Sequence, residues 1–148
     1  MLNREPIFAA LFAKLPGLVT DIVPGPFVTK SRRLKHWNDV PGPEQPALFQ
    51  VGKAQTPEIH LAQGAATKWA LPAELYLYTY DGTEQEAGTT LNLILDQIEA
   101  ALAPPVIDDR QTLGGLVEHC WISAIETDEG ALGAQAMAIV SIEMTVDA

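Results

Sequence analysis

Three stretches of the chain alternate hydrophobic and polar positions with the period of two that is typical of β-strands. They cover residues 67–80, 116–126 and 135–146. Because successive side chains of a strand point to opposite faces of a sheet, the alternation predicts three strands that each bury one face. Pro72 lacks a backbone N–H group, so we expect it at a bulge or on an edge of the sheet.

Two other stretches place hydrophobic residues three or four positions apart, which is the spacing of one face of a helix. The first begins at Asn3, a good N-cap residue, and ends at the proline and glycine of residues 16–17. The second is capped by Thr89 or Thr90 and stops at the prolines of residues 104–105. We therefore predict two amphipathic helices that pack on a sheet. Their apolar faces comprise Ile7, Phe8, Leu11, Phe12 and Leu15 in the first helix, and Leu91, Ile94, Leu95, Ile98, Ala101 and Leu102 in the second.

Residues 27–51 differ from both patterns. A basic strand begins at Phe27, prolines and a glycine between residues 41 and 46 forbid regular structure, and residues 47–51 form a second short strand. We expect these two strands to form a hairpin whose loop is longer than the usual length of about two to five residues. The polar residues 52–64 and the acidic residues 81–88 predict two further exposed loops, the latter mobile.

In chain order the predicted elements are α, β, β, β, α, β and β. This order predicts an α+β fold, with a mainly antiparallel sheet of about five strands and two α-helices packed on one face. The chain is long enough for a single domain over residues 1–148 to bury a core without disulfides or metals.

Charge and composition argue against several classes of function. The net charge of −10 disfavours non-specific nucleic-acid binding, because such binding needs basic side chains that displace counterions from phosphates. No apolar run approaches the roughly 20 residues of a transmembrane helix, so we expect no membrane partner. The single cysteine excludes an intramolecular disulfide.

Motifs that carry chemistry are sparse. The chain has no glycine-rich phosphate loop, no GxSxG nucleophile motif and no zinc-ligand spacing among its histidines. Cys120 lies within a predicted strand, where a buried small hydrophobe is its usual role. The acidic residues 126–129 lack the ligand alternation of a calcium loop, so we interpret them as a solvated turn. The sequence thus predicts no catalytic, cofactor-binding or metal-binding residues, and a protein that is not an enzyme.

The basic strand carries four of the nine lysines and arginines of the chain. Three interpretations stay open: a solvated edge strand, a surface for a partner, and a nucleic-acid site. The sharpest hypothesis is head-to-tail self-association of a basic edge with an acidic edge of the next copy, because heterologous contacts of this kind close into rings. The candidate interface residues are Lys30, Arg32, Arg33, Lys35, Trp37, Asp39, Glu44, Glu126, Asp128 and Glu129.

The chain contains the segments SRRLKHWNDVPGPEQPALFQV, KWALPAELYLYTY, LNLILDQIEAAL and RQTLGGLVEHCWISAIETDEG. As a set they resemble the tail terminator, or tail completion, proteins of long-tailed bacteriophages and prophages. The resemblance covers nearly the whole chain, from Arg4 to about Val146. None of the four segments is a catalytic signature.

This resemblance implies a compact α+β subunit that forms a homo-hexameric ring on the head-proximal end of the tail tube. Such a ring stops tube polymerisation and offers the surface to which head–tail connector proteins bind, while DNA passes through it without specific binding. The expected partners are thus further copies of the chain, the tail tube protein and the connector proteins. The expected location is the virion tail, assembled in the bacterial host cytoplasm.

Two alternatives remain open. One is another neck or head–tail connector protein. The other is a small-ligand-binding α+β module with a pocket lined by Trp69, Tyr76 or Trp121, although aromatic residues at strand spacing more often belong to a core.

Overall fold

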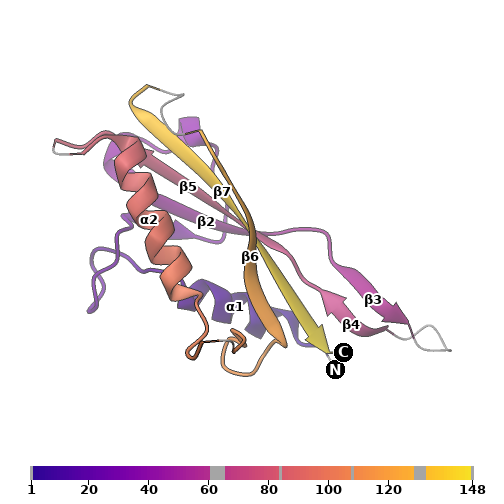
Figure 1. Ribbon diagram of the computed structural model, residues 1–148. Coiled ribbons are helices and arrows are strands. Elements are labelled where there is room, and N and C mark those ends of the chain that lie inside the picture. Colours follow the sequence, from indigo (N-terminus) through magenta and orange to yellow (C-terminus); the bar gives the residue numbers. More distant parts are fainter. Residues whose placement is uncertain (1, 61–65, 84, 108, 129–132, 148) are drawn as a thin grey trace.

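The computed structural model describes residues 2–60, 66–83, 85–107, 109–128 and 133–147 and confirms an α+β fold (Figure 1). Over these residues two helices accompany a sheet of seven strands. No helix of this part of the chain is long and apolar enough to cross a lipid bilayer. The helices are α1 (Arg4–Lys14) and α2 (Ala87–Ala101), the strands are β1 (Thr29–Ser31), β2 (Ala47–Gly52), β3 (Thr56–His60), β4 (Ala66–Ala70), β5 (Ala73–Tyr80), β6 (His119–Thr127) and β7 (Gln135–Asp147), and short 3-10 turns lie at Trp37–Asp39 and Gly42–Glu44.

Strand β7 lies at the centre of the sheet. On one side it pairs with β5 along its first part and with β4 near its end, and on the other side it pairs with β6. The sheet continues from β5 through β2 to β1, and from β4 to β3. Strands β1 and β6 are therefore the two opposite edges of the five strands β1, β2, β5, β7 and β6, whereas β3 and β4 extend as a separate arm (Figure 1).

The expected hairpin of residues 27–51 is wrong, because β1 and β2 run parallel, with Thr29 opposite Ala47. Neighbouring parallel strands need a crossover of about a dozen residues or more, and residues 32–46 are long enough to supply it. The basic strand itself is also shorter than predicted, since β1 covers only three residues. Lys30 is within it, but Arg32, Arg33 and Lys35 follow it.

The sheet is mixed and has seven strands, where the sequence predicted about five that are mainly antiparallel. Strand β3 lies within the expected loop of residues 52–64, because it pairs with β4 and needs no hydrophobic alternation of its own. The long strand expected over residues 67–80 is interrupted between β4 and β5. Pro72 lies in this interruption, as its missing N–H group predicts, and its carbonyl accepts a hydrogen bond from Lys53 N at 3.1 Å.

Two element boundaries also differ from those expected. Helix α2 begins at Ala87 rather than after residues 89–90, because Asp81 Oδ1 accepts a hydrogen bond from Ala87 N at 2.7 Å and so caps the helix from outside it. Strand β6 begins only at His119. A turn at residues 113–116 takes the place of its expected start, and Val117 N donates a hydrogen bond to Thr112 O at 3.1 Å there. The expectation that this strand buries one face is wrong, because Cys120 is the one buried residue of β6, which is an edge strand.

Both helices pack on the same face of the sheet. One core cluster joins buried side chains of α1 and α2 to alternate residues of β5 and β7, as the period-two pattern predicts. Full burial of an aliphatic or aromatic side chain contributes about 1.5–3 kcal/mol, so this cluster is the main source of stability. It includes Ile7, Phe8, Leu11, Leu91, Ile94, Ile98, Leu75, Leu77, Val140, Ile142 and Met144.

The opposite face of the sheet carries a second, smaller cluster under the crossover segment. It consists of Val40, Ala47, Phe49 and Tyr78. Gln45 Nε2 donates a hydrogen bond to Val40 O at 2.9 Å, and the Tyr78 hydroxyl donates one to Lys35 O at 2.8 Å. The proline-rich excursion is thus folded back onto the sheet rather than extended into solvent.

Candidate functional site

The candidate site consists of the two opposite edges of the sheet, which we call the β1 edge and the β6 edge. The β1 edge comprises strand β1 together with those parts of residues 17–44 that lie beside it. The β6 edge comprises strand β6 together with the end of α2 beside it. Of the basic residues predicted to form an interface, Lys30 is used within the subunit. Its Nζ donates hydrogen bonds to Phe12 O at 2.8 Å and Leu15 O at 3.3 Å, where α1 ends.

Lys30 also lies over an aromatic ring, with Nζ 4.5 Å from the centroid of Phe12. Burial lowers the pKa of Lys30 below its usual value, against a smaller opposing effect of Asp21. The cation satisfies carbonyl groups at the C-terminus of a helix, which is a favourable position for a positive charge. The structure therefore gives Lys30 the role of a helix cap rather than that of a group free for a partner.

Arg32 is likewise engaged, because its guanidinium forms an ion pair with Glu5 of α1. A second, longer contact joins Nη2 to Glu5 Oε2 at 3.4 Å. This pair ties the residue after β1 to the first turn of α1. Both side chains remain exposed, so the pair orients the β1 edge more than it stabilises the fold.

Arg33 and Lys35 are the cations of this stretch that point to solvent without an ion pair to any residue that the structure describes. Trp37 is half-buried and packs on the second cluster. Asp39 and Glu44 are exposed on the 3-10 turns. The free positive charge of the β1 edge thus reduces to two side chains.

The remaining acidic candidates within the described residues, Glu126 and Asp128, lie at the β6 edge. Glu126 is exposed near the end of β6. Asp128 closes the turn between β6 and β7, since its carboxylate accepts a hydrogen bond from Met137 N and its own N–H donates to Met137 O at 3.1 Å. Glu129 lies outside the described residues. The structure places Glu126 and Asp128 at the edge opposite the basic candidates, whereas Asp39 and Glu44 lie on the same edge as those cations.

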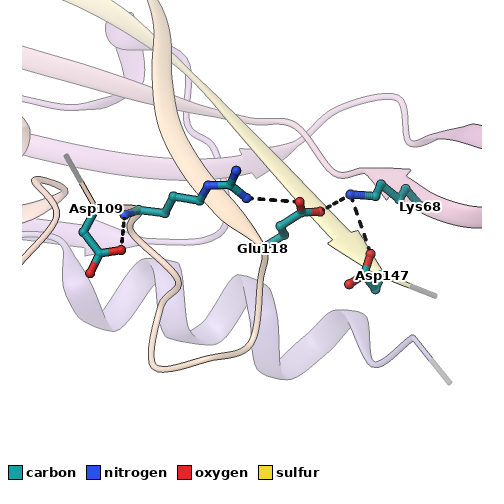
Figure 2. Close-up of polar contacts among 5 residues, drawn as sticks. Lys68, Asp109, Glu118 and Asp147 are labelled. Atoms are coloured by element: carbon teal, nitrogen blue, oxygen red, sulfur yellow. Dashed lines mark hydrogen bonds and ion pairs between the residues drawn. The ribbon is translucent and has the colours of Figure 1, made fainter.

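An ion-pair network that the sequence analysis missed holds the start of β6 (Figure 2). Glu118 Oε2 lies 2.5 Å from Lys68 Nζ, and Glu118 Oε1 lies 3.1 Å from Arg110 Nη1. Lys68 Nζ also lies 3.9 Å from Asp147 Oδ1, and the backbone N–H of Arg110 donates to Asp109 Oδ1 at 2.8 Å. The network joins β4, the loop before β6 and the end of β7, which no local sequence pattern reveals.

The charges of this network shift each other's titration. The hydrogen bond from Lys68, followed by the charges of Lys68 and Arg110, lowers the pKa of Glu118 below its ordinary value. The same hydrogen bond raises the pKa of Lys68. Glu118 is therefore ionised at neutral pH and fixes the residues that follow it.

A pocket of about 320 Å³ lies beside β6 and the end of α2. It is lined mainly by apolar side chains, among them Leu102, Pro104 and Trp121. Trp121 stacks on the His119 ring, with centroids 4.7 Å apart. Cys120 also lines the pocket and is buried as predicted, and burial raises the pKa of its thiol to about 12.

The three aromatic residues proposed for a ligand pocket are not brought together. Trp69 packs against the main core, and the Arg4 guanidinium lies 5.1 Å from its ring centroid. Tyr76 packs on the second cluster and donates a hydrogen bond to Glu74 Oε2 at 2.9 Å. Only Trp121 of the three lines the pocket at the β6 edge.

No protein-family model matches the chain, and no curated protein sequence is significantly similar to it. Among the residues that the structure describes, no group of three histidine, cysteine or acidic side chains is placed to hold a metal ion. The functional interpretation therefore depends on the two edges themselves.

Proposed function

We propose that the protein is a structural subunit of a long-tailed bacteriophage or prophage that closes head-to-tail into a ring on the head-proximal end of the tail tube. The ring stops tube polymerisation and offers the surface on which head–tail connector proteins dock. The observation that supports this best is the placement of free cations and a free carboxylate at opposite edges of one sheet. The resemblance of four segments to tail terminators supports the same function.

The edge geometry favours a heterologous contact. Arg33 and Lys35 lie across the whole sheet from Glu126, so they can pair with Glu126 only in another copy. Strands β1 and β6 run in opposite directions. Strand β1 is parallel to β2, and the three pairings β2 with β5, β5 with β7 and β7 with β6 are each antiparallel. The β1 edge of one copy can thus align with the β6 edge of the next, and repetition of this contact closes a ring when the rotation permits.

The acidic composition suits passage of DNA. A net charge of −10 repels phosphates, so a lumen formed by such subunits does not retain the genome as it moves through. This is the behaviour expected of a channel through which DNA passes without specific binding.

The test is tube growth. Tail tube protein from the same phage or prophage is polymerised with and without the purified chain, and tube lengths and ends are measured by electron microscopy. We expect the parent chain to cap one end as a ring and to shorten the tubes, and we expect the double variant Arg33→Glu, Lys35→Glu to lose this effect. Lys14→Glu is the matched control, because Lys14 is also an exposed lysine but lies at the end of α1.

Two results bear on the alternatives. Capping by the double variant that equals capping by the parent would contradict the role of the β1 edge. Rings that form but leave tube length unchanged, and instead bind a connector protein, would identify the chain as another ring of the neck.

A further inference from the structure

An apolar loop tip projects at the β1 edge. Ile22 is fully exposed, with a relative accessibility of 102%, and Val23 follows at 83%. Two adjacent β-branched side chains that are open to water are unusual on a surface without a binding partner, because removal of apolar groups from water lowers the free energy.

This tip sits on a well-defined loop base. Val19 N donates to Phe27 O at 2.8 Å, and Gly25 N donates to Leu18 O at 3.0 Å. Leu18 N donates to Asp21 Oδ2 at 2.8 Å, which engages the nearest carboxylate within the loop. A Cβ atom at Gly25 would overlap the backbone of Gly17, so the close approach of the two chains requires glycine there. The loop therefore presents its tip in a defined orientation.

The pocket beside β6 is a complementary feature at the opposite edge. Its volume of about 320 Å³ lies at the lower end of the roughly 300–1,000 Å³ of ligand sites, and aliphatic and aromatic side chains line most of it. The ion pairs of Glu118 with Lys68 and Arg110 fix the strand that carries Trp121, so one wall is preorganised. The pocket suits small aliphatic side chains rather than a charged group.

Charge complementarity indicates the occupant. Arg33 and Lys35 lie on the same edge as the apolar tip, whereas the exposed Glu99 and Glu126 lie on the same edge as the pocket. Because β1 and β6 are opposite edges, the tip and the pocket of one copy cannot meet, but those of neighbouring copies can. A second copy of this chain thus brings both the apolar group and the matching charges.

We propose that Ile22 and Val23 of one copy insert into the pocket between α2 and β6 of the next copy and form the seam between subunits. This inference rests on the proposed head-to-tail ring and identifies the contact that holds it together. The apolar contact supplies the affinity, and the flanking charges select the orientation of the two copies.

The first experiment compares assembly of variants by light scattering and electron microscopy, on tube ends as well as in solution. The double variant Ile22→Asp, Val23→Asp should raise the concentration needed for half-assembly by at least about a hundredfold. Ala103→Arg should have a similar effect, because Ala103 is exposed and lines the pocket, so a long side chain there occupies the space without disturbing the core. Leu93→Asp is the matched control, since Leu93 is 48% exposed on α2 and lines neither feature.

The second experiment traps the contact directly. Val23→Cys and Ala103→Cys proteins are mixed and treated with diamide, which oxidises two thiols to a disulfide. We expect a cross-linked dimer from the mixture and none above background from either variant alone. Both proteins also carry Cys120→Ala, because Cys120 lines the same pocket and would otherwise offer a second thiol there.

The outcomes separate this seam from the proposed function. Rings that persist in the aspartate variant, with no cross-link in the mixture, would overturn the seam and leave the ring intact. A correct cross-link in rings that do not limit tube growth would support the seam and contradict the terminator function. A parent chain that stays monomeric in solution and on tube ends would overturn both.

Discussion

The hydroxyl group of Tyr78 anchors the segment that displays the free cations of the β1 edge, and Tyr78→Phe removes only that group. Tyr78 is 4% exposed, and its hydroxyl donates a hydrogen bond of 2.8 Å to Lys35 O. A hydrogen bond of this kind contributes about 0.5–1.5 kcal/mol to stability. For a chain of this length, such a loss lowers the melting temperature by about 2–5 °C.

Tyr76→Phe is the matched control, because it makes the same change on the same strand. The Tyr76 hydroxyl donates to the side chain of Glu74 two residues earlier, at 2.9 Å, and not to the crossover segment. We expect its loss to change the free energy of unfolding by less than about 0.5 kcal/mol, as for most substitutions near a surface. Urea unfolding followed by circular dichroism measures both variants.

The same bond has a signature in alkaline solution. Burial, and then the charge of Tyr76, raise the pKa of Tyr78 above its ordinary value of 10.0. Above that pH the unfolded chain releases the Tyr78 proton more readily than the native state, so native stability falls as the pH rises. Tyr78→Phe removes this contribution and should show a smaller loss of stability between neutral pH and pH values above 10.0.

Hydrogen exchange locates the effect. The N–H of Asp39 donates to His36 O at 2.8 Å within the anchored segment, so its exchange should accelerate in Tyr78→Phe and not in Tyr76→Phe. Equal stability losses in the two variants, with unchanged exchange at Asp39, would refute the view that this hydroxyl holds the crossover segment on the sheet.

Three further predictions follow from the structure. Glu118→Gln should lower stability at neutral pH but not in acid. Because the pKa of Glu118 is lowered in the native state, its ion pairs stabilise the fold above its ordinary pKa of 4.5, and this contribution is lost as the pH falls through the lowered pKa. Melting temperatures of parent and variant that differ equally at all pH values would contradict this prediction. Gly25→Ala should alter the loop beneath the apolar tip, seen as shifted amide resonances of residues 17–27 in nuclear magnetic resonance spectra, while unchanged resonances would disprove the close approach of Gly25 to Gly17. Cys120 should react with a thiol reagent at neutral pH at least about a hundredfold more slowly in the native protein than in urea, because burial keeps the thiol protonated, and equal rates would place it at the surface.

The sequence by itself determined the elements whose signal is local. The hydrophobic spacing of α1 and α2 and the alternation in β5 and β7 each reflect burial of one face against the core, so they can be recognised without knowledge of the neighbours. The alternation in β6 predicted its strand but not its burial, because only Cys120 of that edge strand is buried. The buried position of Cys120 followed from the same alternation. The prediction is therefore accurate for helices and strands that bury one whole face against the core, because their own sequence pattern records that burial.

Only the tertiary structure decided which strands are neighbours. Strand β3 exists because β4 supplies hydrogen-bond partners, and β1 runs parallel to β2 because the crossover returns the chain to the same end of the sheet. The role of each basic residue was equally hidden: Lys30 is taken by carbonyls of α1 and Arg32 by Glu5, which leaves Arg33 and Lys35 at the edge. These assignments depend on groups that are distant in sequence, and a charge pattern along one strand carries no information about them.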